Sequence, residues 1–251
     1  MDFDRESSLR GLVPLVMHRI IRDKPFYWED LQEHEFCQLL DFIGDRWAVF
    51  QPDICLPHAR WMLTFDDGNI SDYDVAFRLL IEKKIKATFF VIVDKIGTPG
   101  HLNWAQVKEM HSYGMCIGSH GRSHCRMVAL SKKEAQCEFN ESRQQLEDFL
   151  GAPVLAFSYP FGVCSPQLHQ LGFAAGYRFL CTSNHGVISS SSRIIPRNTI
   201  NSAMGWGEIA KVMIPTLTTR FRWVLEDQVK TVIKATLGPE RYMSWRNRVM
   251  R

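Results

Sequence analysis

Four side chains in this sequence could together carry out a metal-assisted hydrolysis. Asp66 and Asp67 stand side by side after one apolar run, and His120 and His124 follow another, four residues apart. One carboxylate and two imidazoles make a three-ligand metal site that leaves room for water and a substrate, as catalytic zinc sites do. Such a metal lowers the pKa of its bound water to roughly 7 and polarises a carbonyl group. The second carboxylate is then available as a base, so the set suits hydrolysis of an amide or an ester.

Each of these signals also has a structural explanation when it is taken alone. The Asp-Asp-Gly sequence that begins at Asp66 has the composition of a strand-ending turn. His120 and His124 would share one face of a helical turn, but a surface or capping pair has the same spacing. A third segment, 157–162, contains a Tyr-Pro-Phe-Gly turn that either borders a pocket or is only a turn. The shared position of all three signals after apolar runs favours the functional interpretation.

The elements that must position these residues alternate between strand-like and helix-like patterns. The expected strands are Leu12–Met17, Trp61–Phe65, Ala87–Val93, Met115–Ser119, Val154–Ser158, Tyr177–Cys181 and Arg193–Pro196. The expected helices are Asp74–Lys84, Trp104–Tyr113, Ser131–Leu150 and Ser165–Leu171, with a mostly helical tail from Glu208. This alternation predicts an α/β fold with a parallel sheet and outer helices, either a (β/α) barrel or an open doubly wound sheet. We predict a single-domain, distorted barrel of about seven strands, because a barrel gathers the candidate residues at one face.

Composition excludes several other classes of protein. The chain has 251 residues, 45% hydrophobic and 23% charged, with a formal net charge of +3, which is ordinary for a globular enzyme. No Lys/Arg-rich run or Gly-rich phosphate loop supports binding of nucleic acid or a dinucleotide. No segment has the pattern of a signal peptide or a membrane-spanning helix. The 7 cysteines are scattered, which favours a reducing compartment, so we expect a cytoplasmic protein.

Three segments resemble the motifs of a known family. Thr64–Gly68 and Ser119–His124 look like the first two motifs of the polysaccharide deacetylase family, also called carbohydrate esterase family 4 or the NodB homology domain. Lys86–Phe90 also matches the family in kind, and the resemblance extends from about Leu12 to Ile200. It implies a NodB-like barrel related to the TIM barrel.

The resemblance also implies a role for each of the four residues. Asp66 corresponds to the catalytic base, and the metal ligands correspond to Asp67, His120 and His124. We expect one divalent ion in this site. Zinc is the first choice for two imidazoles and one carboxylate, and cobalt, nickel or iron would also suit them.

Two departures from the family pattern concern the surroundings of the base. Many members carry Ser or Thr where this chain has Gly121, and the third motif often carries an Arg where this chain has Ser158. The Phe-x-Tyr-Pro-Phe-Gly form is similar to a subgroup that lacks this Arg. In that subgroup Arg197 would supply the missing positive charge, although a surface residue at a strand end fits the sequence equally well. The turn itself gives the expected substrate-binding residues, which are Tyr159, Pro160 and Phe161.

The general acid is expected from the beginning of the chain. The family places a Leu-x-His motif near its C-terminus, but none of the 9 histidines here lies beyond His185. Leu15–Arg19 contains His18 at the end of the first expected strand, and some members are circularly permuted so that this strand comes first. We therefore assign the general acid to His18, with His185 as a weaker candidate and a buried structural role for His18 as the alternative.

The resemblance implies an enzyme that removes N-acetyl groups from an N-acetylated sugar or a polysaccharide precursor, as in exopolysaccharide biosynthesis. The alternatives are a related C–N hydrolase, such as an amino-sugar deformylase or an allantoinase-like amidohydrolase, and a non-catalytic sugar-binding module. We expect an N-terminal extension (1–11), a catalytic domain (12–200) and a helical C-terminal segment (201–251) that packs on the barrel. Amphipathic helices at Phe221–Leu237 and Tyr242–Met250 favour packing over contact with a membrane or a partner.

Overall fold

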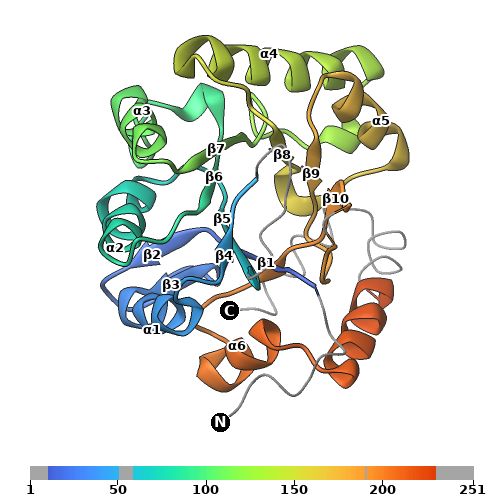
Figure 1. Cartoon of the computed structure of the whole chain (residues 1–251). Coiled ribbons are helices and arrows are strands. Elements are labelled where there is room, and N and C mark those ends of the chain that lie inside the picture. The colour runs from blue at the N-terminus through green and yellow to red at the C-terminus, as the bar shows by residue number, and fades with distance from the viewer. Residues whose placement is uncertain (1–10, 51–58, 190, 230–251) are drawn as a thin grey trace.

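The barrel wall is a single parallel sheet. The computed structural model describes residues 11–50, 59–189 and 191–229, and in these ranges nine strands pair in the order β11-β1-β5-β6-β7-β8-β9-β10, with β4 beside β5. The wall curls and the helices lie outside it (Figure 1). The strands are β1 (Val13–Met17), β4 (Trp47–Ala48), β5 (Trp61–Phe65), β6 (Thr88–Val91), β7 (Cys116–Ser119), β8 (Ala156–Ser158), β9 (Phe179–Cys181), β10 (Ile194–Ile195) and β11 (Asn198–Thr199). The predicted distorted, single-domain (β/α) barrel is confirmed.

Both faces of the sheet are buried, which explains why its strands are almost continuously apolar. Every residue of β1 and β5 is buried, and the two strands pair in register from Val13 with Trp61 to Met17 with Phe65. Side chains along a strand alternate between the two faces. One face packs against the helices, and the other forms a smaller cluster around Met62, Phe90, Ala156, Phe179 and Cys181. We call this second face the inner face.

Capping residues mark the start of several described helices. They are α1 (Glu33–Ile43), the π-helical turn η2 (Asp72–Phe77), α2 (Arg78–Glu82), α3 (Trp104–Ser112), α4 (Lys132–Leu150), α5 (Pro166–Ala174) and α6 (Gly205–Met213). Short 3-10 turns are η3 (Val93–Lys95), η4 (Met127–Ala129) and η5 (Pro160–Gly162). In α4, Ser131 and Glu134 form a capping box and Gly151 ends the helix with φ +67°. The predicted Ser131–Leu150 helix therefore agrees with α4.

Some elements differ from the prediction. The helix α1 was not anticipated, although Phe36, Leu39, Leu40 and Ile43 form its buried stripe. A separate two-stranded parallel sheet, β2 (Arg19–Ile21) with β3 (Asp30–Gln32), was also not anticipated. Strands this short carry too few residues to show a period in the sequence.

The barrel closes through a split segment near residue 197. β10 pairs with β9, whereas β11 pairs with β1, and Pro196-Arg197 lies between the two strands. The chain therefore crosses from one edge of the wall to the other (Figure 1). Arg197 is buried in this crossing, with 1% of its surface exposed.

The C-terminal part of the described chain packs against the barrel. Ile209, Val212 and Met213 of α6 are buried, and the Trp61 indole N–H donates to the Met213 carbonyl (3.0 Å). Residues 217–229 form a further helix. Within the described ranges, no helix has the length and apolar character required to span a bilayer. The expected helix Tyr242–Met250 and residues 1–10 of the expected extension lie outside the described residues.

Candidate active site

The candidate residues gather where the parallel strands end. His18 directly follows β1, Asp66 and Asp67 follow β5, His120 follows β7 and Tyr159 follows β8. Because all these strands run in the same direction, their carboxyl ends form one edge of the barrel.

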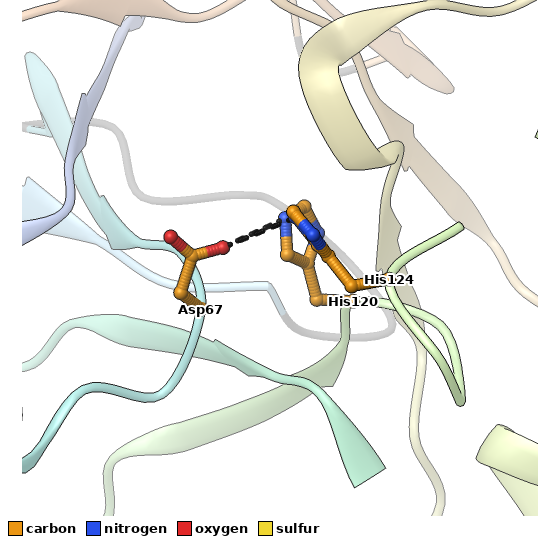
Figure 2. A group of neighbouring side chains, drawn as sticks. All are labelled: Asp67, His120 and His124. Atoms are coloured by element: carbon orange, nitrogen blue, oxygen red, sulfur yellow. Dashed lines mark ion pairs between the residues drawn. The ribbon is translucent and has the colours of Figure 1, made fainter. Parts of the chain in front are cut away.

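Asp67, His120 and His124 converge on one point (Figure 2). The Asp67 Oδ1 atom lies 3.4 Å from His120 Nε2 and 3.3 Å from His124 Nε2, and the three ligand atoms all lie within 4.8 Å of one another. Two ligands bound to one tetrahedral zinc at about 2.0–2.1 Å would be separated by about 3.4 Å. The spacing of the three atoms therefore fits a single small divalent ion.

The hydrogen bond made by His120 orients it as a ligand. Its Nδ1 lies 2.8 Å from the Ser158 carbonyl oxygen, which can only accept a hydrogen bond. Nδ1 must therefore carry the proton, and Nε2 presents its lone pair toward Asp67. A backbone carbonyl that holds the outer nitrogen of a histidine in this way is the usual second partner of a metal-binding imidazole.

Electrostatics near the triad favour bound cations. Burial lowers the pKa of His124 to about 4 with a further contribution from His120, so His124 is neutral and able to ligate at neutral pH. Burial would raise the pKa of Asp67, but its hydrogen bond with His120 and the nearby histidines hold it well below its ordinary value. The triad therefore offers one anionic and two imidazole ligands, although without an ion the nearby aspartates raise the pKa of His120 against the effect of burial.

The loop geometry that brings the ligands together is strained. Asp67 (φ +78°), His124 (φ +60°) and Phe161 (φ +60°) are three of the four described non-glycine residues with positive φ. Such conformations cost of order 1–3 kcal/mol and persist where the surroundings impose them, often at functional sites. The idea that His120 and His124 share a helical turn is wrong, because the segment between them is irregular. The imidazole centroids nevertheless lie 5.0 Å apart.

A residue that the sequence analysis missed holds this loop in place. Glu138 of α4 is buried, and its carboxylate accepts hydrogen bonds from the Arg122 N–H (2.8 Å), the Ser123 N–H (3.1 Å) and the Ser123 hydroxyl (2.6 Å). Gly121 has φ +82°, and a Cβ there would lie 3.2 Å from the Glu138 carboxylate. The positive φ and this close approach both disfavour the Ser or Thr of the family pattern at position 121, and Glu138 anchors the loop. The available signal was a glutamate on the core-facing stripe of α4.

Asp66 is held by a buried positive charge. It continues the inward-facing positions Met62 and Thr64 of β5, so it points to the inner face. There Arg197 donates from Nη1 to Asp66 Oδ1 (2.6 Å) and from Nη2 to Oδ2 (2.7 Å). The Ser158 hydroxyl donates to the same Oδ2 (3.0 Å) and accepts from Arg197 Nη2 (2.7 Å). The structure thus brings together Asp66, Arg197 and Ser158.

This arrangement keeps Asp66 ionised. Burial alone would raise the pKa of Asp66, but the charges of Arg197 and His120 and the Arg197 hydrogen bonds outweigh it and bring the pKa to about 2. The bidentate pairing also fixes the plane of the carboxylate. Asp66 is therefore an oriented anion at neutral pH, adjacent to the candidate metal ligands.

His18 lies close enough to Asp66 and Asp67 that its charge lowers the pKa of both. Its Nδ1 is buried and has no hydrogen-bond partner among the described residues. The Trp28 ring lies 6.3 Å from the His18 ring. His185 is placed differently: its Nδ1 pairs with Asp227 Oδ1 (2.9 Å), and its ring stacks on Trp223 in the helix 217–229.

The three residues of the third motif have different environments. Tyr159 is fully buried, and its hydroxyl lies 3.0 Å from His169 Nδ1. Its backbone N–H donates to the Cys181 carbonyl (3.1 Å), so this group is not available to a substrate. Pro160 is buried, whereas Phe161 is 39% exposed with its ring 4.7 Å from the His124 ring. Of the three side chains, Phe161 borders the triad.

The sequence profile described as Polysaccharide deacetylase matches residues 53–180, about half of the chain, and the chain therefore belongs to the polysaccharide deacetylase family.

Similar curated proteins share part of their length with this chain. The putative polysaccharide deacetylase YxkH of Bacillus subtilis is 30% identical over 128 residues, which covers 51% of this chain and 46% of that protein. Chitin deacetylase 2 of Cryptococcus neoformans var. grubii is 31% identical over 103 residues, 41% of this chain and 22% of that protein. The chain thus spans less than half the length of these relatives.

Solved structures cover more of the fold. The Streptococcus pyogenes deacetylase PplD in complex with acetate superposes with a TM-score of 0.74 at 25% identity, covering 82% of this chain and 99% of that chain. IcaB from Ammonifex degensii gives a TM-score of 0.70 at 25% identity and covers 81% of this chain and 97% of that one. The likeness therefore includes nearly the whole of both known structures.

Proposed function

We propose that this protein is a metal-dependent hydrolase that removes N-acetyl groups from an N-acetylated saccharide. The observation that carries the proposal is the convergence of Asp67, His120 and His124 beside an ionised, oriented Asp66. Family membership and the likeness to PplD, which was solved with acetate, also support it. We further propose that the chain is a circularly permuted member, because His18 precedes the Asp-Asp motif.

Asp67, His120 and His124 would hold one divalent ion, for which zinc is the first choice and cobalt, nickel or iron alternatives. When bound, the ion polarises the acetyl carbonyl and makes a water molecule acidic at neutral pH. The remaining steps belong to side chains of this chain.

Asp66 would accept the proton of the attacking water. A base of this kind must be ionised and within reach before the reaction begins, and the ion pair with Arg197 meets the first requirement. Arg197 and Ser158 act as positioning residues, because they hold the carboxylate plane and do not reach the substrate in this assignment. Arg197 thereby takes the place of the arginine that the third motif lacks.

His18 would donate a proton to the departing nitrogen. It approaches Asp66 and Asp67 from the end of β1, on the opposite side of Asp67 from the strand that carries the two histidine ligands. His185 is not suited to this step, since it is engaged with Asp227 and Trp223. Phe161 would contact the acetylated sugar, because it is the exposed ring beside His124.

Three variants and a matched control test the roles of the base and the metal ligands. Asp66→Asn should retain bound metal and lose acetate release, whereas Asp67→Asn and His124→Ala should lose both, measured by elemental analysis and by an acetate assay on N-acetylglucosamine oligomers. Asp74→Asn, an exposed aspartate in η2, is the matched control and should behave as the wild type. Acetate release by Asp66→Asn at the wild-type rate would refute the assigned base. Formate release in place of acetate would indicate a deformylase.

A further inference from the structure

The loop that follows β9 supports the arginine that holds the proposed base. Arg197 Nε donates to the Thr182 carbonyl (3.4 Å), and the Arg197 backbone N–H donates to the Asn184 carbonyl (2.8 Å). The same guanidinium binds both carboxylate oxygens of Asp66. The loop 182–186 therefore contacts Arg197 at two points, and a shift of this loop would also shift the group that orients Asp66.

A helix from the C-terminal part of the chain contacts the next residue of this loop. In the helix 217–229, which is red in Figure 1, Asp227 Oδ2 accepts from the His185 backbone N–H (2.8 Å), and Asp227 Oδ1 lies 2.9 Å from His185 Nδ1. The buried Trp223 ring of the same helix stacks on the imidazole, with the centroids 5.6 Å apart and the planes at 13°. The helix thus holds His185 at its backbone, at a ring nitrogen and across one ring face.

A cavity of about 710 Å³ lies where the loop faces the helix. Its lining includes Thr182 and Asn184 of the loop, Val224 of the helix, and the pair His185 and Asp227. Atoms that border a cavity have no packed neighbours on that side, so close packing alone does not fix the loop against the helix. The position of the loop on this side therefore depends on the polar and stacking contacts of His185.

The barrel holds the loop on the other side of His185. The Asn198 side chain donates to the Gly186 carbonyl (2.8 Å), and its oxygen accepts from the Gly186 N–H (3.0 Å). The same amide donates to the Pro14 carbonyl (2.9 Å), which fixes Asn198 against β1. The loop is therefore held between β11 and the helix, and loss of one support would displace it only in part.

We propose that Asp227 is a positioning residue of the active site, which holds the loop 182–186 so that Arg197 keeps the Asp66 carboxylate in its reactive orientation. This inference rests on the proposed function. Asp227 acts through His185, which thereby has a structural role in place of proton transfer. The family profile ends at residue 180, so the loop, the arginine and the helix all lie beyond the segment that it matches.

A double-mutant cycle on kcat tests this role. Asp227→Ala should lower kcat for acetate release from N-acetylglucosamine oligomers about tenfold with KM and bound metal unchanged, because a base misplaced by 1 Å costs about 100-fold and Asn198 still holds part of the loop. In an Arg197→Met background, the same substitution should change kcat by less than about twofold, because the connection to Asp66 is already broken. A residue with only a structural role would lower kcat equally in both backgrounds. All four proteins are compared at a temperature at which thermal unfolding curves show them to be folded.

Two further variants separate the geometry of the contact from its charge. Asp227→Asn should retain most of kcat, because its amide can accept from the His185 N–H and donate to Nδ1 of a neutral imidazole. Glu226→Ala removes the neighbouring acid of the same helix and its ion pair with Arg222 (3.2 Å), so it is the matched control and should behave as the wild type. A loss of kcat in Asp227→Asn as large as that in Asp227→Ala would assign the effect to charge and overturn the positioning role.

Hydrogen exchange at the Arg197 side chain gives a readout that does not depend on turnover. The Arg197 Nε–H, followed by NMR, should exchange about tenfold faster in Asp227→Ala than in the wild type, because local opening becomes easier. Equal losses of kcat in both backgrounds, or unchanged exchange at this N–H, would overturn the inference and leave deacetylation standing. If the wild type releases no acetate, deacetylation fails, and the exchange measurement still decides whether Asp227 holds Arg197 in place.

Discussion

The buried ion pair between Arg197 and Asp66 gives the sharpest prediction. Replacing Arg197 with Met preserves much of the side-chain length but removes the guanidinium. Asp66 then keeps the Ser158 hydroxyl as a donor and loses the bidentate partner of both carboxylate oxygens. The carboxylate would remain buried, beside the triad, without the charge that holds its pKa at about 2.

The expected destabilisation follows from this burial. Removing one partner of a buried ion pair typically costs about 3–5 kcal/mol, because the other charge is left uncompensated. For a chain of this size, each kcal/mol corresponds to about 2–4 °C in Tm, so Arg197→Met should unfold roughly 6–20 °C earlier. The double variant Asp66→Asn/Arg197→Met should recover much of this loss, since a buried pair contributes little beyond an apolar replacement of similar volume.

Thermal unfolding of the four proteins in EDTA measures the coupling between the two sites. The double-mutant cycle should give a coupling energy of about 2–3 kcal/mol, as for residues in one hydrogen-bonded network. Acetate release by Arg197→Met should fall about 100-fold or more, because the base is no longer oriented. Additive effects of the two substitutions, or wild-type stability of Arg197→Met, would refute the pairing as the reason for the burial of Arg197.

Three further predictions concern residues around the site. Glu138→Gln should weaken metal affinity by about 10–100-fold in a competition titration, because the loop of His124 loses its anionic acceptor; unchanged affinity would contradict this anchoring role. Burial, with smaller contributions from Asp67 and Asp66, raises the pKa of Asp72, so the folded state retains a proton that the unfolded state releases above about pH 4. Stability should therefore fall as pH rises from that point, and Asp72→Asn should raise Tm at pH 7 and flatten its pH dependence; a lower Tm would contradict a protonated carboxyl. The Trp223 ring is buried and stacks on His185, so Trp223→Ala should lower the free energy of unfolding by about 3–5 kcal/mol and make the helix 217–229 susceptible to limited proteolysis. Resistance to the protease at the wild-type level would show that the helix docks without this ring.

The positions of the candidate residues could be predicted because they depend on local pattern and topology. Each follows an apolar run, and a parallel sheet places the ends of such runs at one edge. The same reasoning identified the helix Ser131–Leu150, which agrees with α4, because it is one amphipathic segment. No comparable rule relates Trp28 to His18, whose rings lie 6.3 Å apart, because their proximity depends on how a short loop folds back after β2.

The contacts that orient the site are long-range, which is why spacing alone did not reveal them. Asp66 and Arg197 are separated by 131 residues, and the sequence could pair them only through the missing arginine of the third motif. Glu138 accepts a hydrogen bond from Ser123, which is 15 residues earlier in the sequence, and the helix that carries Glu138 has the pattern of an ordinary amphipathic segment. Hydrogen bonds of this kind depend on the distance between elements, and residue type gives no measure of that distance.

The split closing segment places an arginine from the end of the sheet beside Asp66, where we propose that it substitutes for the arginine of the third motif. Ser158 is small and lies on the inner face, so the guanidinium of Arg197 can occupy the space beside Asp66 and donate to both residues. Arg197 Nε also donates to the Thr182 carbonyl (3.4 Å), and the guanidinium lies over the Phe90 ring at 5.2 Å. A larger side chain at position 158 would compete for this space. The serine and the arginine are therefore a matched pair, and a change at either one should be tolerated only with a compensating change at the other.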